Sequence, residues 1–318
     1  MDSQTQITVD LLSEGLRADR FLASKFSQLS RATWQKGFKN DWVKLNGKII
    51  SADARLKNGD NLELDGRFFA QDPVLLENLP LADLNIVFET PDWLVVEKPT
   101  GLLVHPTAHS QEATLTASLL ACYPEMAEAG DDPMRPGIVH RLDKDASGLL
   151  VVAKHQNAFE ILKEQFKKHT VLKTYQALVY GDVVKGQGTL KQPIGRSGDG
   201  TKMSVGSGKD LKPAWTQYQI LRHYYDPASS QKFTLLEVRI KTGRTHQIRA
   251  HLHALGHPLV GDKIYRLKRP KKIKGLPRLF LHAQVLGFND LRDKYREFNS
   301  PLPADLEIFL KRLRSYHV

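Results

Sequence analysis

Cysteine is almost missing from this sequence: Cys122 is the only one among 318 residues. A single cysteine excludes an intramolecular disulfide and a zinc site built from cysteine ligands. No apolar run approaches the roughly 20 residues that a membrane-spanning helix needs. The N-terminal run MDSQTQITVD also lacks the basic start and the apolar middle of a signal peptide. We therefore expect a protein of the reducing cytoplasm.

Sequence motifs for common cofactors are missing as well. No GxGxxG pattern precedes a predicted helix, and neither a phosphate-binding P-loop nor a cysteine cluster is present. We therefore expect the chain to need no cofactor and no metal. The hydrophobic fraction of 41% and the charged fraction of 25% are ordinary for a globular protein, and 318 residues suit about two domains.

Acidic residues are outnumbered: the net charge is +11 and the isoelectric point is near 9.5. The charges are also segregated along the chain. Eleven Lys and Arg residues but a single acid, Asp262, lie between Lys241 and His282, whereas nine acids and one Arg lie between Asp60 and Glu97. A merely soluble surface would mix the two signs, so this distribution favours a polyanionic partner such as a nucleic acid.

The first 70 residues are predicted to form a small domain of two helices and a hairpin. Phe21, Leu22 and Phe26 are spaced like the apolar face of a helix, and Ser30 can cap a second helix. An Asn-Gly pair interrupts the alternating run VKLNGKII, as the tight turn of a hairpin does.

Two basic helices followed by a VKLNGK hairpin resemble the alpha-L RNA-binding module, which was first known from a small-subunit ribosomal protein. The resemblance covers about residues 8–66 and departs at Asp41, where such modules usually have Gly. It implies that the domain binds RNA through exposed basic residues. The candidates are Arg31, Lys36, Lys39, Lys44 and Lys48. The alternative is a small helical cap on a larger domain.

The chain from residue 84 onward, after a proline-containing linker at 71–83, is rich in predicted strands. Apolar or alternating runs predict strands at 86–88, 93–96, 138–139, 149–153, 172–180 and 233–240. One helix is predicted over 159–166, and another is capped by Thr245 and closed by Gly256. Strands and helices do not alternate regularly. We therefore expect an α+β domain over 84–318 with a mainly antiparallel mixed sheet.

A polar loop, HRLDKDASG, lies between two of these apolar runs. Rigid strands with a polar loop between them are a common setting for catalytic groups. Asp143 lies in this loop, and the neighbouring cations Arg141 and Lys144 favour its charged form. An ionised carboxylate can serve as a nucleophile, a base or a metal ligand. A structural loop held by ion pairs explains the spacing equally well.

Basic and aromatic residues elsewhere could complete a site. Arg244, His246 and Arg249 cluster near a predicted helix start, where anions bind. An arginine fork there could also orient Asp143. Tyr175, on a predicted strand beside basic residues, could stack on a base, although a lone aromatic is more often part of the core. The basic run at 266–274 is either a phosphate-binding segment or a solvated loop. Arg244 and four members of this run are candidate RNA contacts: Lys268, Arg269, Lys271 and Lys272.

Six motifs occur in one order from about residue 84 to 290. They are KPTGLLVHP at 98–106, GIVHRLD at 137–143, YQALV at 175–179, TGRTHQIRAH at 242–251, GHPLVGD at 256–262 and LHA at 281–283. Together they closely resemble the RluA family of pseudouridine synthases, especially members that modify large-subunit ribosomal RNA. Ala146 stands where relatives often have Thr. The resemblance implies a pseudouridine synthase catalytic domain that isomerises uridines in RNA without a cofactor.

The resemblance also implies roles for individual residues. Asp143 matches the catalytic aspartate, and Arg249 matches the arginine that pairs with it. Arg141 matches a residue that helps to displace the target nucleotide and fills its place. Tyr175 matches the aromatic that stacks on the uracil, and Leu281 matches an apolar residue of the base pocket.

Two other functions are compatible with parts of the sequence. The fold could belong to a non-catalytic RNA-binding protein of ribosome assembly, although the intact set of matched site residues argues against it. A metallohydrolase is suggested by four crowded histidines, whose spacing matches no usual metal site. They are His246, His251, His253 and His257. The combined prediction is a monomeric, cytoplasmic enzyme that acts on ribosomal RNA, with transfer RNA as the alternative substrate.

Overall fold

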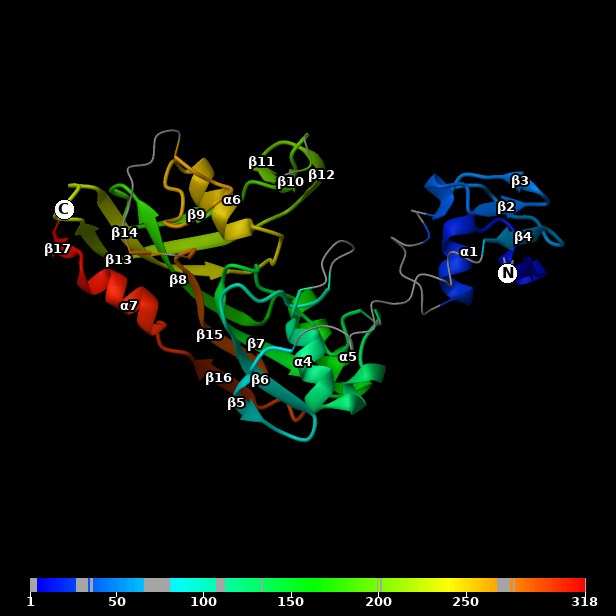
Figure 1. Cartoon of the computed structure of the whole chain (residues 1–318), viewed down its shortest axis with the longest axis horizontal. Helices are drawn as coiled ribbons and strands as arrows, with labels where there is room; N and C mark the ends of the chain where they lie inside the picture. The colour runs from blue at the N-terminus through cyan, green and yellow to red at the C-terminus, as the bar shows by residue number, and fades with distance from the viewer. Residues whose placement is uncertain are drawn as a thin grey trace. The chain divides into compact units, whose positions relative to one another are not determined.

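The computed structural model describes residues 5–26, 34, 37–65, 81–106, 112–132, 134–198, 200, 202–267, 275–276 and 278–317. The chain divides into two compact units, Met1–Asn78 and Leu79–Val318 (Figure 1). Within the described ranges, no helix is both long enough and apolar enough to cross a membrane.

The N-terminal unit contains a four-stranded antiparallel sheet. Its elements are β1 (Thr5–Thr8), the 3-10 helix η1 (Leu11–Ser13), α1 (Ala18–Lys25), β2 (Val43–Leu45), β3 (Lys48–Ile49) and β4 (Asn61–Leu64). The strands lie in the order β1-β4-β2-β3. Asn46 (φ 49°) and Gly47 (φ 79°) form the turn between β2 and β3. Both have the positive φ that a tight hairpin turn needs, so the hairpin prediction is confirmed.

A small apolar core holds this unit together. Phe21 and Leu22 on α1 are fully buried, as the predicted helix face requires, and Trp34 and Leu62 pack in the same cluster. Residues 34 and 37–39 are helical, and the remainder of the predicted second helix lies outside the described residues. That remainder includes Ser30, Arg31 and Lys36. Most of the predicted linker at 71–83 also lies outside them.

A ten-stranded sheet forms the centre of the C-terminal unit. Its main path runs β17-β13-β14-β8-β15-β7-β6-β5, with β16 paired to β15 and β9 paired to β13. The strands are β5 (Asn85–Glu89), β6 (Trp93–Lys98), β7 (Ser147–Ala153), β8 (Leu172–Tyr180), β9 (Gln187–Leu190), β13 (Thr216–Tyr225), β14 (Lys232–Ile240), β15 (Leu281–Asn289), β16 (Tyr295–Asn299) and β17 (Arg314–Tyr316). Among these described strands, only β7 and β15 pair in parallel. The predicted α+β fold with a mainly antiparallel mixed sheet is therefore confirmed.

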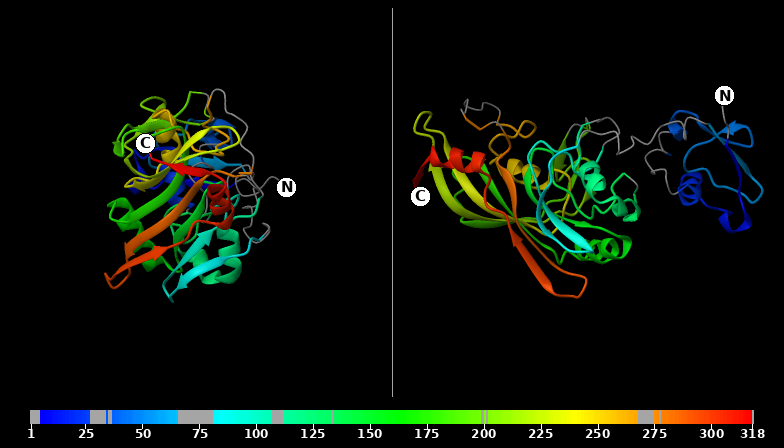
Figure 2. Two further views of the ribbon diagram at one scale, coloured as in Figure 1. Left: turned by 90° about the vertical axis from the view of Figure 1, so that its left-hand side faces the viewer. Right: turned by 60° about the horizontal axis from the view of Figure 1, so that its bottom comes forward.

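Helices cover both faces of this sheet. They are α4 (Leu115–Cys122), the 3-10 helix η3 (Pro124–Glu128), α5 (Gln156–Lys167), α6 (Gln247–Ala254) and α7 (Ala304–Lys311). Alternate residues of β6 separate the two faces, as the pleat of a strand dictates. Leu94 and Val96 share a core with α4 and α6, while Trp93 and Val95 share one with α5. Helix α7 packs near β14 and β17, at the other end of the sheet (Figures 1 and 2).

Two local predictions around the motifs are wrong. Helix α6 is not capped by Thr245: its N-cap is His246, with a left-handed φ of 54° and no capping side chain. The side chain of Gln247 organises this turn instead, because its Oε1 accepts a hydrogen bond from the Arg244 amide (3.1 Å). The strand predicted at 138–139 is reduced to an isolated bridge, since the chain has only just turned at Gly137 (φ 70°).

A smaller sheet lies against α6. It consists of β10 (Ile194–Arg196), β11 (Met203–Val205) and β12 (Lys209–Lys212), in the order β11-β10-β12. Ile194 of β10 and Ala250 of α6 are buried in one cluster with Tyr265. Gly256 follows α6 with a φ of 92°, as the sequence predicts for the residue that ends this helix.

His140 anchors the loop at 140–146 to the main sheet. Its Nε2 accepts a hydrogen bond from the Val151 amide of β7 (3.1 Å), and its ring stacks on Phe166 of α5 with 4.4 Å between centroids. Because Nε2 is an acceptor, the ring must be neutral with its proton on Nδ1. Burial, helped by the charge of Lys173, lowers the pKa of His140 to about 3.

Gly148 allows β7 and β15 to approach closely. Its φ of 120° is unfavourable for other residues, and an added Cβ would lie 2.2 Å from the carbonyl oxygen of Ala283. This contact brings the end of the loop before β7 next to the start of β15, so the two segments lie side by side.

Replacing Gly148 with Ala should destabilise the C-terminal unit by at least about 2 kcal/mol, because the two backbones would have to separate. Gly186→Ala is the matched control, since nothing lies within 4 Å of an added Cβ there and its φ is not in the left-handed range. The control should change stability by less than about 0.5 kcal/mol. Urea unfolding followed by circular dichroism measures both variants, and equal stabilities would contradict the close approach.

Acid should weaken the C-terminal unit through His140. The pKa of this imidazole is 6.5 in the unfolded chain and about 3 in the folded one. The unfolded state therefore binds the proton first, so stability is complete above the unfolded value and falls as the pH drops. At about pH 5 this one group costs about 2 kcal/mol.

The control for this pH effect is His140→Gln. Its amide oxygen can accept the Val151 hydrogen bond but does not titrate. Between about pH 7.5 and pH 5, the variant should lose about 2 kcal/mol less stability than the wild type. The same loss in both proteins, measured by urea unfolding, would rule out a neutral His140 anchor.

Candidate active site

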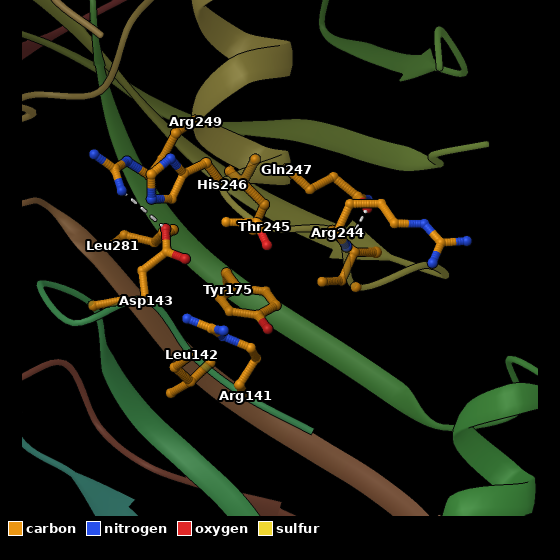
Figure 3. Close-up of a pocket in the computed structure, with 14 residues that line it drawn as sticks. Arg141, Leu142, Asp143, Tyr175, Arg244, Thr245, His246, Gln247, Arg249 and Leu281 are labelled. Carbon is orange, nitrogen blue, oxygen red and sulfur yellow. Dashed lines mark hydrogen bonds and ion pairs between the residues drawn. The ribbon is translucent and has the colours of Figure 1, made fainter. Parts of the chain in front are cut away.

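A hollow opens where the 141–146 loop, β8, the start of β15 and the N-terminal end of α6 meet (Figure 3). It contains about 470 Å³ of empty space when its open mouth is included. The residues that line it are Arg141, Leu142, Asp143, Ala146, Tyr175, Ile240, Gly243, Arg244, Thr245, His246, Gln247, Ile248, Arg249 and Leu281. All five site residues implied by the family resemblance are therefore brought together.

Arg249 connects two carboxylates in this hollow. Its Nη1 donates to Oδ2 of Asp143 (3.1 Å), and its Nε and Nη2 donate to Oδ2 and Oδ1 of Asp262 (2.7 and 2.8 Å). The pair with Asp262 is bidentate, a geometry that fixes the guanidinium plane. The backbone amides of Ile264 and Tyr265 hold Asp262 in turn (2.8 and 3.0 Å). Asp143 is thus oriented, through Arg249, by a second acid.

Arg249 and Asp262 are buried, so each of them needs the opposite charge of its partner to stay ionised. The side chain of Arg249 is 3% exposed and that of Asp262 is fully buried, whereas that of Asp143 keeps 15% exposure. Burial alone would lower the pKa of Arg249, but Asp262 and Asp143 raise it above its ordinary value. Burial would also raise the pKa of Asp262, and the hydrogen bonds from Arg249 lower it. Arg249 and Asp262 therefore stay charged, and Asp143 is the member of the three that a substrate can reach.

Three other predicted site residues surround Asp143. Arg141 comes from the same loop and is exposed. Tyr175 on β8 and Leu281 at the start of β15 are 6% and 4% exposed. The Tyr175 ring lies between Arg141 and the start of α6 at His246 (Figure 3). Burial and the nearby Asp143 raise the pKa of the Tyr175 hydroxyl, so it stays neutral. The hollow thus offers an aromatic ring, an apolar wall and a carboxylate.

Two residues of the KPTGLLVHP motif bind the C-terminal part of the 141–146 loop. Lys98 is fully buried, and its ammonium donates to three backbone carbonyl oxygens at 2.8–3.0 Å, two within its own motif and one at Lys144. The Thr100 hydroxyl donates to the carbonyl oxygen of Asp145 (2.8 Å). Burial lowers the pKa of Lys98 to about 7, although the charge of Asp143 opposes the shift. The motif therefore clamps the backbone that follows the carboxylate.

A buried chain of hydrogen bonds fixes the start of β7. Arg278 donates from Nη2 to Ser147 Oγ, which lies 2.9 Å from Nδ1 of His282, and His282 Nε2 lies 3.3 Å from the Ser300 carbonyl oxygen. A carbonyl oxygen only accepts, so His282 donates from Nε2 and accepts at Nδ1. The Ser147 hydroxyl must then donate to His282. Since Leu281 precedes His282, the same chain fixes one wall of the hollow.

The predicted RNA contacts fall into three groups. Arg244 lines the hollow, donates from Nε to the Pro213 carbonyl oxygen (3.1 Å) and turns its guanidinium away from Asp143 (Figure 3). Three candidates in the N-terminal unit are exposed: Lys39, Lys44 and Lys48. The others lie outside the described residues: Arg31, Lys36, Lys268, Arg269, Lys271 and Lys272.

The crowded histidines have other partners. In the part of the chain that the structure describes, no three His, Cys, Asp or Glu side chains are grouped so that they could hold a metal ion. The two ring nitrogens of the buried His251 face Thr216 Oγ1 (2.8 Å) and the Gln192 carbonyl oxygen (2.9 Å). Nδ1 of His257 faces the carbonyl oxygen of Tyr180 (2.9 Å). These histidines connect α6 and the segment after it to neighbouring strands.

Two residues that shape the site have no role in the sequence interpretation. Asp262 holds Arg249, and the buried Gln247 joins Thr242 (2.7 Å) to the Trp215 carbonyl oxygen (3.0 Å). The charge pattern contains a signal for Asp262, because it is the single acid among eleven basic residues between 241 and 282. No comparable signal marks Gln247, whose partners depend on the fold.

Known proteins resemble the chain over almost its whole length. Residues 92–254 match the family model described as RNA pseudouridylate synthase. An uncharacterized RNA pseudouridine synthase of Bacillus subtilis is 38% identical, over 98% of this chain and 99% of its own. Ribosomal large subunit pseudouridine synthase D of Haemophilus ducreyi is 34% identical, over 99% of this chain and 95% of its own.

A solved structure agrees with these relatives. Human RNA pseudouridylate synthase domain containing 1 superposes with a TM-score of 0.58 at 27% identity, covering 77% of this chain and 92% of its own. The sequence relatives extend over both units, and the family model spans the 141–146 loop, β8 and α6. The chain therefore belongs to the RluA family of RNA pseudouridylate synthases and is an RNA pseudouridine synthase.

Proposed function

We propose that this enzyme converts specific uridines of large-subunit ribosomal RNA to pseudouridine, with Asp143 as its catalytic group. The observation that carries the proposal is the Asp143 carboxylate, held by Arg249 in a hollow that Tyr175 and Leu281 also line. The choice of RNA rests on the name of the Haemophilus ducreyi relative. We also propose that the enzyme acts as a monomer.

The reaction defines what the site must do. The glycosidic bond between ribose carbon 1′ and uracil nitrogen 1 breaks, the base turns, and a bond forms between carbon 1′ and ring carbon 5. Ring carbon 5 loses its proton, and nitrogen 1 gains one. No electrons pass to another molecule and no group is imported, so the chemistry requires neither a cofactor nor a co-substrate.

The target base must leave its stack to reach Asp143. Extrusion of a nucleotide costs a few kcal/mol, and stacking on an aromatic side chain returns roughly 1–3 kcal/mol per base. The neutral ring of Tyr175 can supply this stacking, and Leu281 can cover another part of the base. Arg141, exposed on the same loop as Asp143, can fill the vacated place and hold a phosphate.

One oxygen of Asp143 is available for the chemistry. Arg249 binds Oδ2, and no hydrogen bond from a described residue reaches Oδ1. The free oxygen can attack carbon 1′, attack the base or take a proton from the sugar, and each of these needs a carboxylate in a fixed orientation. Arg249 supplies that orientation, while Asp262 keeps Arg249 in place. A base bound in the hollow would also displace water from it, which limits attack of water on the detached sugar.

We also propose that the N-terminal unit binds RNA as an alpha-L module. The β2–β3 hairpin carries Lys44 and Lys48 in exposed positions, and Lys39 lies shortly before it. Within the described ranges, none of the three forms an ion pair with a carboxylate, so their charges are available to phosphates. Further candidates lie outside the described residues: Arg31, Lys36, Lys268, Arg269, Lys271 and Lys272.

Asp143→Asn should lower the isomerisation rate by at least about a thousandfold, because an amide cannot supply the charged oxygen. RNA binding should stay nearly intact, since the two side chains have almost the same shape. Activity is measured as tritium release from a large-subunit ribosomal RNA transcript labelled at uracil carbon 5. Binding is measured on the same transcript by filter retention.

Asp145→Asn is the matched control for this substitution. It removes the same charge from the same loop, but Asp145 does not line the hollow, so most of the activity should remain. Full activity of Asp143→Asn, or equal losses in the two variants, would contradict the catalytic role of Asp143. Tritium release from transfer RNA but not from the ribosomal transcript would correct the proposed substrate.

A triple variant in which Ala replaces Lys39, Lys44 and Lys48 should bind the transcript more weakly. The slope of its log Kd against log salt concentration should be shallower by about two, because each lost phosphate contact removes part of the counterion release. A triple Ala variant on α5 matches the charge change. It replaces Lys163, Lys167 and Lys168, which pair with Asp131 or Glu164. Equal salt slopes for the two triple variants would argue against RNA binding by the hairpin.

A further inference from the structure

Two lysine side chains lie over one tryptophan ring beside the hollow. The ammonium of Lys241, directly after β14, is 3.7 Å from the centre of the Trp215 ring, and that of Lys191, directly after β9, is 4.9 Å from it. Both lysines are exposed. Cation–π contacts are strongest on tryptophan and hold the cation in one place. These three residues form the Lys–Trp–Lys cluster.

The cluster is fixed to the segment that builds the hollow. The Trp215 amide donates to Thr242 Oγ1 (2.8 Å), and the Trp215 carbonyl oxygen accepts from the Lys241 amide (3.2 Å) and from Gln247 Nε2 (3.0 Å). Gln247 begins α6 and lines the hollow. The backbone of Trp215 is therefore fixed to the start of α6.

The indole N–H group of Trp215 makes no hydrogen bond to a described residue. Nε1 of Trp215 is buried and has no hydrogen-bond partner in the part of the chain that the structure describes. An unpaired buried donor of this kind costs about 1–3 kcal/mol. Since no hydrogen bond offsets this cost, the contribution of the ring lies in its packing and in its faces, which carry the two ammonium groups.

Positive charge around the cluster is not neutralised. Among the described residues, Lys191, Lys241 and Arg244 form no ion pair with a carboxylate. Arg244 lines the hollow and donates to the carbonyl oxygen of Pro213, two residues before Trp215. Arg244 at the hollow and the two lysines of the cluster therefore form one group of unpaired cations. Like charges held close together repel one another, and an anion bound among them removes that repulsion.

We propose that the Lys–Trp–Lys cluster binds a backbone phosphate of the RNA next to the nucleotide that enters the hollow, an inference that rests on the proposed RNA substrate. A phosphate fits better than a base, because the Lys241 ammonium at 3.7 Å already covers a face of Trp215 on which a base would stack. An RNA strand with one nucleotide in the hollow carries phosphates on both sides of it. Because Trp215 is hydrogen-bonded to Gln247, which lines the hollow, the cluster is adjacent enough for us to assign it one of these flanking phosphates.

The test compares Lys191→Ala, Lys241→Ala and the double variant with the wild type in binding a fluorescein-labelled RNA hairpin that has uridines in its loop. Each single variant should weaken binding about three- to tenfold and make the slope of log Kd against log salt concentration shallower by about 0.7. Lys→Arg at either position should preserve binding, because a guanidinium also binds phosphate. The control is Lys311→Ala on α7, which removes a lysine that already pairs with Glu307 (3.7 Å) and should leave affinity unchanged.

The contribution of the ring is tested separately. Trp215→Phe keeps an aromatic face and should bind nearly as well as the wild type, whereas Trp215→Leu should approach the affinity of the double lysine variant. Circular dichroism establishes that each variant folds. If Trp215→Leu does not fold, the lysine variants decide the question alone.

Wild-type affinity and salt slope in the double lysine variant would overturn the proposal, and so would a wild-type protein that does not bind the hairpin. Failure of the proposed ribosomal target has a different signature. The lysine variants would still lose affinity for the hairpin, but the wild type would release no tritium from a large-subunit ribosomal RNA transcript labelled at uracil carbon 5.

Discussion

The burial of Arg249 is the constraint on which the rest of the site depends. A buried cation is stable only when its N–H groups find hydrogen-bond acceptors. Asp262 accepts two hydrogen bonds from Arg249 in a bidentate pair. The third nitrogen donates to Asp143. Without Asp262, the Asp143 carboxylate alone would have to neutralise a buried guanidinium, and both of its oxygens would be drawn into that pair. With the second acid in place, Arg249 binds only Oδ2 of Asp143 and leaves Oδ1 outside the ion pair.

The main sheet brings these side chains together from distant parts of the sequence. The 141–146 loop leads into β7, which pairs in parallel with β15 where Gly148 permits a close approach. Lys98 at the end of β6 binds the loop backbone from one side, and the Ser147–His282 hydrogen bond fixes its far end from another. A loop held at these points presents Asp143 in one geometry, so little conformational entropy remains to be lost when the substrate binds.

Much of this fold can be predicted from the sequence because its central strands are buried and regular. Apolar or alternating runs mark β6, β7, β8 and β14, and an Asn-Gly turn marks the N-terminal hairpin. The strands β1 and β10 are too short to give a clear pattern, and β12 is exposed along its whole length. The start of α6 escapes prediction because it depends on a left-handed His246 and not on a capping side chain. In the site, spacing alone leaves Asp143 between a structural and a catalytic role, and the catalytic role that we propose rests on the resemblance of the ordered motifs to the RluA family. The partnership of Asp262 with Arg249 follows only from the fold, because a charge pattern does not specify which cation an acid will meet.

Paired and unpaired cations separate the residues that support the site from those that we propose to meet the substrate. Inside the unit, Arg249 and Lys98 have their donors directed at carboxylates or carbonyl oxygens. At the rim, Arg141, Lys191 and Lys241 form no ion pair with any described carboxylate. Pairing inside makes the geometry rigid, whereas unpaired charge outside leaves a positive field for a polyanion. In the function that we propose, phosphate contacts at the rim would not depend on the position of the target base, so they would persist while that base is extruded. Their binding free energy can therefore offset the part of the extrusion cost that stacking in the hollow does not return.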